Sequence, residues 1–560
     1  MGKQTKHPRG LMVLFFTEMW ERFGFYLLIG IFFLYMTTGK DNQFPGMGFS
    51  GVKAADIYGS YLALVYLTPF IGGLLADRYL GYRLSITIGG LLFSAGYFGL
   101  AINNTTTFYL SLLLIIMGNG LFKPNISTLV GKIYDSNPKY RDMKDSGYNI
   151  FYMGINVGAF ICNFIAAYLR INYGWGWAFA AAGVGMLIGV IWFWSGQLFT
   201  DNIKKVDKIS PPTKEDMSMS KIFKTLFLPA IFAGVIGWLI PGNIFSSDST
   251  DAFIFFSLVV VIFYYNIYRT AGKHEKQPIK ALLAVFGSVI IFWAIFHQNG
   301  AALTVWAQKY TNREVPAAIE QPIKKLNLNQ VVTTDLREVP RTDLHGAAVL
   351  DEHGDPVVEM DPNPYFQNIP KEKWPESGKL NLISPELFQS INPFFIILFT
   401  PLVVGFFNLL ARKRKKGPVT TPAKIGWGMV ITALSAVVMI LAVIASNNGA
   451  HKVSPAWLFG TYAVITVGEL CLSPMGLSLV SKLSPPRITA LMMGGWFLST
   501  SIGNKLSGVL SGLWDTYDNK AYFFTTNALL AMVSVILIFI MLPWLNRVMK
   551  EHSKNEKQSD

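Results

Sequence analysis

The sequence predicts an all-α polytopic membrane protein with fourteen transmembrane helices. Three observations lead to this fold class. Charged residues make up only 15% of the 560 residues, whereas soluble proteins carry about 25%. Fourteen apolar stretches each come near or exceed the roughly 20 residues that a helix needs to cross the hydrocarbon core. The Lys and Arg residues gather in alternate connections between those stretches, as they do in multi-pass membrane proteins.

The predicted spans follow one another along the whole chain. The first carries three charged residues and is too long for a cleaved signal peptide, so we expect it to remain as a helix. The spans cover residues 11–36, 54–76, 84–104, 107–130, 148–170, 177–198, 223–243, 250–268, 281–308, 387–411, 422–446, 454–481, 488–513 and 522–546.

The distribution of positive charge predicts the orientation. Alternate connections, starting with the N-terminus, hold 31 Lys and Arg residues, and the opposite short loops hold five. Basic residues near helix ends stay in the cytoplasm, so we expect a multi-pass protein of the cell membrane with both termini cytoplasmic. The net charge of +14 then reflects topology and attraction to the anionic lipid bilayer, and nucleic acid is excluded as a partner.

A weak internal repeat predicts two similar halves. Thr68-Pro69 recurs as Thr400-Pro401, and Gly118 has its counterpart in Gly468. These pairs relate the second span to the tenth and the fourth to the twelfth. Chance recurrence of Gly and Pro is the alternative, since both are common in membrane helices. Two parallel six-helix repeats with spans seven and eight inserted between them match the layout of the major facilitator superfamily.

The repeat also predicts the domain boundaries. We expect the segment 309–384 to be a β-rich or irregular external excursion, and we attach no chemistry to it. The predicted parts are an N-terminal six-helix bundle at 1–200, a cytoplasmic linker with the two inserted helices at 201–280, a C-terminal six-helix bundle at 281–547 and a cytoplasmic tail at 548–560.

Charged residues inside the spans are the candidate functional residues, because a charge at the bilayer centre is costly unless it pairs or faces water. Glu18, Glu21 and Arg22 share one face of the first helix. Lys123 and Glu469 are isolated in apolar surroundings and need partners across helix interfaces. A static salt-bridge network is the alternative interpretation, but ionisable residues within a membrane point to function by default.

Three further residues are predicted to carry no chemistry. Lys505 lies nearer the external end of its helix, and we expect its ammonium group to snorkel toward the interface. Cys162 and Cys471 both fall inside apolar stretches, so neither a disulfide framework nor a cysteine metal site is expected. We expect no metal and no cofactor.

The first helix carries a recognisable motif. Glu18-Met-Trp-Glu21-Arg22-Phe-Gly-Phe25-Tyr26 resembles the ExxERFxYY signature of the proton-dependent oligopeptide transporters, a branch of the major facilitator superfamily. The resemblance covers both halves. It continues through Thr68-Pro69, Ala76-Asp77-Arg78, Lys123-Pro124-Asn125, Asn156, Asn392-Pro393, Gly468-Glu469 and Gly494-Gly495-Trp496.

The resemblance implies roles for individual residues. It assigns the carboxylate end of a di- or tripeptide to Arg22 and Lys123, and the amino end to Glu469 with help from Asn156 and Asn392. A zwitterion needs cationic groups on one side and an anionic group on the other, which agrees with this division. The resemblance also implies that Tyr26, Tyr66 and Trp496 line the cavity. The candidates for proton coupling are Glu18, Glu21, Arg22, Lys123 and His297, and we expect the two glutamates of the first helix to compete for Arg22 and Lys123.

The sequence departs from the family pattern at four positions. Phe25 stands where the family usually has a tyrosine, and Gly59 stands where animal members carry a histidine. Ile29 and His297 occupy the positions of an arginine and an acidic residue that resemble a gating salt bridge. For His297, a hydrogen-bonded core role and a proton or gate role both remain open.

The functional hypothesis is a proton-coupled symporter that imports di- and tripeptides by alternating access. The chain contains no Walker motif, and no obligatory protein partner is evident. One alternative is a transporter of another anionic or amphoteric solute, such as nitrate or a peptide-like metabolite. A membrane-embedded enzyme is the other alternative, but the sequence offers no convincing nucleophile or metal cluster for it.

Overall fold

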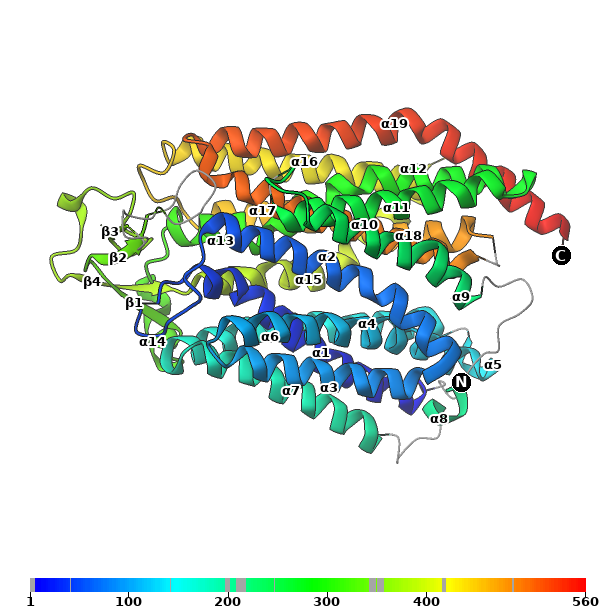
Figure 1. The fold of residues 1–560 in the computed structure, drawn as a ribbon, viewed down its shortest axis with the longest axis horizontal. Coiled ribbons are helices and arrows are strands. Elements are labelled where there is room, and N and C mark those ends of the chain that lie inside the picture. Colours follow the sequence, from blue (N-terminus) through cyan, green and yellow to red (C-terminus); the bar gives the residue numbers. More distant parts are fainter. Residues whose placement is uncertain are drawn as a thin grey trace.

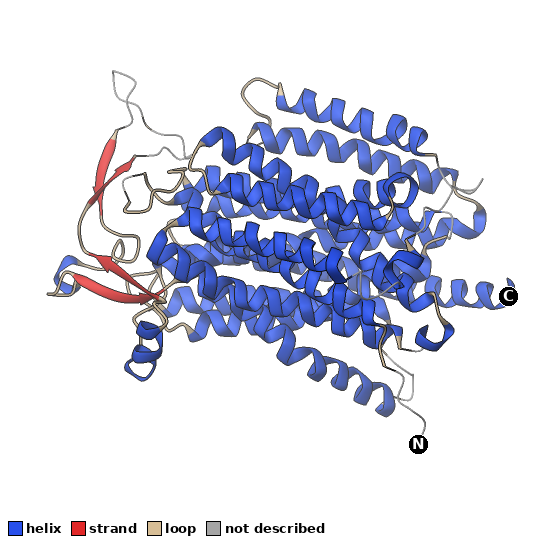
Figure 2. Cartoon of the chain, turned by 90° about the horizontal axis from the view of Figure 1, so that it is seen from below, coloured by secondary structure: helices blue, strands red, loops and turns tan. Residues whose placement is uncertain are grey.

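A computed structural model shows an elongated bundle of long, roughly parallel helices with a small β-containing cap at one end (Figures 1 and 2). The two termini lie at the other end (Figure 1). The structure describes residues 6–40, 42–141, 143–196, 202–207, 218–245, 247–341, 349, 357–414, 419–485 and 488–559. Residues 201 and 208–217 of the predicted cytoplasmic linker therefore lie outside the described residues.

The N-terminal bundle contains six long helices. Within it, α3 packs against α4 and α7, and α1 packs against α6 and α7. The helices are α1 (Arg9–Thr37), α2 (Gly51–Leu75), α3 (Tyr82–Leu100), α4 (Thr105–Asp135), α6 (Lys144–Tyr173) and α7 (Trp175–Gly196), with the short α5 (Pro138–Arg141) and α8 (Asn202–Val206) at the end opposite the cap (Figure 1).

The C-terminal bundle repeats this arrangement with one broken helix. The predicted span 281–308 lies within one membrane-spanning segment, Lys273–Lys309, which a 3₁₀ turn at His297–Gly300 divides into α12 and α13. Gln298 and Asn527 exchange two amide hydrogen bonds of 3.1 and 2.9 Å across this break, which stabilises it. The helices are α12 (Lys273–Phe296), α13 (Ala302–Lys309), α15 (Ile391–Lys413), α16 (Thr421–Ala445), α17 (Ala456–Leu483), α18 (Thr489–Gly512) and α19 (Lys520–Ser559).

Two further long helices lie between the bundles in sequence and form an antiparallel pair, as the sequence predicts. They are α10 (Leu228–Trp238), which follows the short α9 (Met219–Ile222) and a π-helical turn, and α11 (Asp248–Thr270). The Ser247 side chain accepts from the Thr250 N–H at the start of α11, and acidic residues occupy the first turn, which favours helix initiation there. α11 contacts α2, α12 and α18.

The long external segment forms the cap. It contains α14 (Ala317–Lys325) and two antiparallel strand pairs, β1 (Asn329–Thr333) with β4 (Lys379–Ile383) and β2 (Arg337–Pro340) with β3 (Val358–Asp361). A small apolar core of Val332, Tyr365, Phe366 and Leu382 holds it together.

The surface of the helices is that of a membrane protein. Among the described residues, thirteen helices are long and apolar enough to span a bilayer. The remaining predicted span, 488–513, is the helix α18, whose Gly and Ser residues and Lys505 lower its hydropathy. Large apolar side chains such as Leu239 and Ile540 are 70% and 71% exposed, as expected of side chains that face lipid. The fold is the predicted major facilitator arrangement.

The two bundles touch along α2–α18 and α6–α15. Arg170 of α6 forms an ion pair of 2.7 Å with Glu386, just before α15. Ser501 of α18 donates a 2.6 Å hydrogen bond to the Ala63 carbonyl of α2. These contacts lie between the middle of the helices and the end that carries the cap, so the two bundles are closed against each other on the side of the cap.

Candidate functional site

The motif on α1 forms a compact buried ion cluster. Arg22 donates two hydrogen bonds to the Glu21 carboxylate, one of them 2.7 Å from Nη2 to Oε1. Its Nε also lies 3.3 Å from Glu18 Oε1. All three side chains are at most 3% exposed. The second oxygen of Glu18 is buried without a hydrogen-bond partner, so Glu21 is the carboxylate that holds Arg22 most fully.

Lys123 of α4 lies beside this cluster but is not part of an ion pair. Its ammonium nitrogen lies 4.2 Å from the centre of the Tyr66 ring, a cation–π contact. Arg22, Glu18 and Glu21 are within electrostatic range of it. Among the described residues, Lys123 has no carboxylate within ion-pair distance, and it lies behind Tyr66 outside the lining of the cavity described below.

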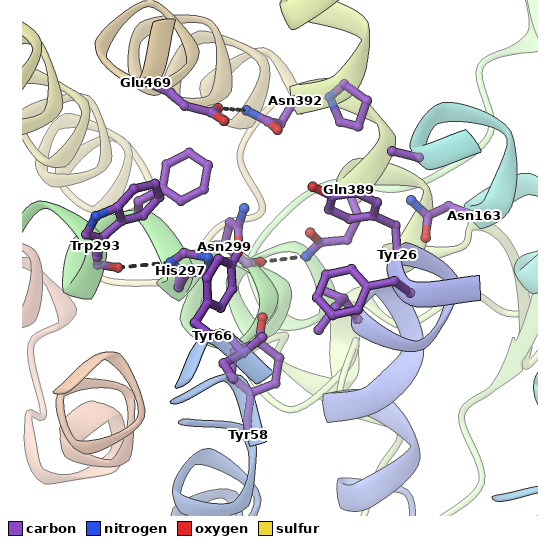
Figure 3. Close-up of a pocket in the computed structure, with 16 residues that line it drawn as sticks. Tyr26, Tyr58, Tyr66, Asn163, Trp293, His297, Asn299, Gln389, Asn392 and Glu469 are labelled. Atoms are coloured by element: carbon purple, nitrogen blue, oxygen red, sulfur yellow. Dashed lines mark hydrogen bonds between the residues drawn. The ribbon is translucent and has the colours of Figure 1, made fainter. Parts of the chain in front are cut away.

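Glu469 of α17 is the opposing charge from the C-terminal bundle. Asn392 of α15 donates a 3.1 Å hydrogen bond to Glu469 Oε2 and a 2.9 Å hydrogen bond to Thr466. Within the part of the chain that the structure describes, no Lys or Arg pairs with Glu469. The asparagine therefore orients the carboxylate without neutralising it, and Figure 3 shows both side chains together on one side of the cavity.

A partly enclosed cavity lies between the two bundles. Tyr26 and Tyr66 line it, and each is within electrostatic range of Arg22 and of Glu469. Figure 3 shows them across the cavity from Glu469. The lining residues are Phe25, Tyr26, Ile29, Tyr58, Leu62, Tyr66, Ala159, Asn163, Trp293, Phe296, His297, Asn299, Gln389, Asn392, Pro393 and Glu469.

His297 lines the cavity at the break between α12 and α13. Its Nδ1 lies 3.2 Å from the Trp293 carbonyl oxygen. Its ring packs edge-on against Tyr66 of the other bundle, with the ring centres 5.6 Å apart. Ile29, the other position at which the sequence departs from the family's salt bridge, also lines the cavity. Because isoleucine carries no charge, these two positions cannot form an ion pair. The structure satisfies both open interpretations of the histidine, since it is hydrogen bonded and it borders the cavity.

Four of the eight residues predicted to bind peptide lie outside the lining: Arg22, Lys123, Asn156 and Trp496. Asn156 donates a 2.9 Å hydrogen bond to the Tyr152 carbonyl of its own helix. Trp496 is 3% exposed and packs against Phe286, with ring centres 6.3 Å apart. Their predicted contact with a peptide stays a prediction for another state of the protein.

Sequence reasoning missed several lining residues. Gln389 donates hydrogen bonds to the Asn299 carbonyl and to Thr304, the latter of 2.7 Å. Asn163 donates a 3.1 Å hydrogen bond to Ser390 across the bundle interface. Gln389 and Ser390 belong to the 3₁₀ turn Pro385–Ser390, directly before α15. No motif in the sequence predicts that this turn faces the cavity.

The predicted snorkelling of Lys505 is wrong. Its ammonium group lies 2.6 Å from Asp56 Oδ1 of α2, and its side chain is 4% exposed. The sequence does not predict this ion pair, because Asp56 lies near the end of its span, on a helix far from Lys505 in sequence.

Comparisons with known proteins identify the family of the chain. The model of the POT family matches residues 83–324 and 377–531. The chain is 30% identical over 551 residues to the transporter YclF of Bacillus subtilis (strain 168), covering 97% of this chain and 95% of the relative. It is 29% identical to the di-/tripeptide transporter of Lactococcus lactis subsp. lactis (strain IL1403), covering 96% and 95%.

A solved structure shows the same fold. It is a glutamate-to-glutamine variant of the peptide transporter POT in complex with alafosfalin, with a TM-score of 0.73 and 29% identity. The match covers 97% of this chain and 96% of the solved chain.

Proposed function

The chain belongs to the POT family, the proton-dependent oligopeptide transporters, and from this premise we propose that it imports di- and tripeptides together with protons. It is a multi-pass membrane protein. The proposal places it in the cell membrane with both termini in the cytoplasm, acting without an obligatory protein partner and without enzymatic activity.

The arrangement of Lys123 and Glu469 carries the substrate proposal. Each is a charge without an ion-pair partner among the described residues, one cationic and one anionic, and they come from opposite bundles. A peptide with free termini would supply both missing partners at once. Binding would thus draw the two bundles together, as alternating access requires. Tyr26 and Tyr66 lie between the two charged ends and would contact the backbone.

The ion cluster on α1 supports proton coupling. Protonation of Glu21 would release Arg22, which could then join Lys123 in binding the peptide carboxylate. Proton and substrate binding would be linked through a shared cation. The uncharged pair of Ile29 and His297 leaves the family's gating salt bridge unavailable for this role.

Uptake into proteoliposomes tests the proposal. With an inward proton gradient, a labelled dipeptide should accumulate, and dissipating the gradient should abolish accumulation. A free amino acid should neither accumulate nor compete, because it cannot reach both charged ends. Uptake of nitrate that unlabelled dipeptides do not inhibit would favour the alternative solute and refute the peptide assignment.

A further inference from the structure

A second polar cluster, with Lys505 buried and Asp56 26% exposed, lies on the external side of the cavity, where three parts of the chain meet. The Lys505 ammonium group on α18 lies 2.6 Å from Asp56 Oδ1, 2.8 Å from Ser60 Oγ and 2.7 Å from Ser249 Oγ. Asp56 and Ser60 belong to α2, and Ser249 belongs to the first turn of α11. All three N–H donors of the lysine are therefore used, each with a partner on another helix.

The inserted helix pair completes the coordination of the carboxylate. Ser249 Oγ lies 2.8 and 2.6 Å from the two oxygens of Asp56, and Ser247 Oγ donates to Oδ1 at 2.9 Å. The turn that presents these serines is held by Asp251, which accepts from the Ile244 N–H at 2.6 Å and the Phe245 N–H at 2.9 Å. The hydrogen bonds of Asp251 thus fix the turn, and the turn places the serine hydroxyl groups next to the ion pair.

The backbones of α2 and α18 approach closely beside this cluster. A Cβ atom on Gly59 would lie 2.7 Å from Gly508 Cα, so only glycine permits the contact. Asn504 adds a 3.3 Å hydrogen bond to the Leu62 carbonyl. Lys505 and Asp56 are in different bundles, and therefore they must separate if the bundles part on the external side.

We propose that Asp56, Lys505 and Ser249 form an external latch that holds the cavity closed to the outside, with the inserted pair α10–α11 acting as its third component. The latch keeps a buried cation and a carboxylate paired only while the bundles touch. Opening costs this pairing, so the latch biases the equilibrium toward the externally closed state. It gives the inserted helices a part in transport, and it does not depend on which solute is carried.

Distance measurements between spin labels test the latch in the full chain without substrate. One label replaces Thr105 at the external start of α4, and the other replaces Tyr522 at the start of α19. Both positions are exposed, and both native cysteines are buried. Asp56→Asn should increase the population with the longer external distance at least about threefold. Ser249→Ala, which removes one hydroxyl group and no charge, should shift it in the same direction by a smaller factor.

Asp135→Asn is the matched control, because it breaks an exposed 2.7 Å Lys–Asp pair within the N-terminal bundle and should leave the distances unchanged. The charge reversal Asp56→Lys with Lys505→Asp should return the distribution toward that of the wild type.

A distribution for Asp56→Asn that matches the control would overturn the latch. A shift with Asp56→Asn but none with Ser249→Ala would refute the part of the inserted pair. If Asp56→Asn does not fold, an unchanged distribution in Ser249→Ala is sufficient to overturn the proposal. Failure of dipeptide uptake alone would bear on the proposed substrate and leave this result standing.

Discussion

Substitution of Glu469 is the most direct test of the proposed peptide substrate. Its only described side-chain hydrogen bond is with Asn392, so a peptide ammonium group would find an anion that no cation neutralises. We predict that Glu469→Gln raises the KM of peptides with a free amino terminus by about 10- to 100-fold, because a hydrogen bond to a charged group contributes roughly 1.5–3 kcal/mol.

Competition assays with matched peptides provide the control. N-acetylated peptides should bind to Glu469→Gln and to the wild type alike, and the exposed Glu551→Gln should change neither. Equal losses for free and blocked peptides would show that Glu469 serves packing or protonation.

Glu21 and His297 have different predicted effects on coupling. Glu21 accepts two hydrogen bonds from Arg22, so we predict that Glu21→Gln abolishes gradient-driven accumulation but leaves peptide exchange at equal proton concentrations. His297 packs against Tyr66 and forms no ion pair among the described residues. His297→Ala should therefore lower the rate and preserve the gradient response. The opposite result would move the coupling role to the histidine.

The charged site residues could be predicted from the sequence because burying a charge in a membrane is costly, and so each one stands out. Gln389 and Asn163 could not, since neutral amides occur commonly in helices and carry no such signal. The partner of Lys505 was likewise hidden, because pairing depends on which helices cross.

At the scale of elements, the break between α12 and α13 shows where sequence patterns fail. The stretch is apolar on both sides of His297, Gln298 and Asn299, and its hydropathy predicts a single span. The reciprocal amide bonds between Gln298 and Asn527 stabilise the break, and Gly300 permits it. A Cβ atom on Gly300 would lie 1.7 Å from the Tyr58 hydroxyl of the other bundle. Such tertiary contacts override local helix propensity.

A lysine from outside the cap packs against it. Lys452, in the loop between α16 and α17, donates a hydrogen bond to the Lys309 carbonyl, and its ammonium nitrogen lies 4.6 Å from the centre of the Tyr365 ring. Arg313 lies 5.4 Å from the same ring. Burial, together with the charges of Arg313 and Lys309, lowers the pKa of Lys452 to about 7.

This depressed pKa predicts that the cap becomes more stable as the pH rises. Between pH 7 and the ordinary lysine pKa of about 10.4, the unfolded cap binds more protons than the folded cap, so stability increases with pH across this window. Below pH 7 the ammonium group of Lys452 is charged in the folded cap, and the full cost of burying that charge lowers the stability of the cap. Hydrogen exchange of β1 and β4, corrected for intrinsic rates, should show greater protection at pH 9 than at pH 6. Lys452→Met should remove the difference, whereas the exposed Lys379→Met should retain it. Equal protection at both pH values in the wild type would contradict the prediction.

For the whole molecule, the repeat and the distribution of positive charge predicted two six-helix bundles with an inserted pair. They did not predict which helices join the bundles or that the external side is closed. That information lies in long-range contacts such as α2–α18, which leave no periodic signal in either helix. Arg170 illustrates this point, because sequence patterns place it simply among the few external cations.

In the structure, Arg170 is part of a buried ion pair between the bundles. Its Nε lies 2.7 Å from Glu386 Oε1, Ser384 donates to Oε2 at 2.8 Å, and Glu386 is fully buried. Removing one partner of a buried pair costs about 3–5 kcal/mol, whereas replacing both with apolar groups of similar volume is often neutral. We predict that Glu386→Gln lowers dipeptide uptake at least about tenfold by destabilising the externally closed state.

The double substitution Arg170→Met with Glu386→Met separates the cost of an unpaired charge from a requirement for the pair itself. If the pair acts only by keeping two charges satisfied, the double variant should recover uptake to within about threefold of the wild type, since no charge is left buried alone. The spin-label distances should recover with it. If the double variant is as slow as Glu386→Gln while its closed population is normal, the ion pair must instead be needed during the transition, where its breaking and re-forming would set the rate of transport.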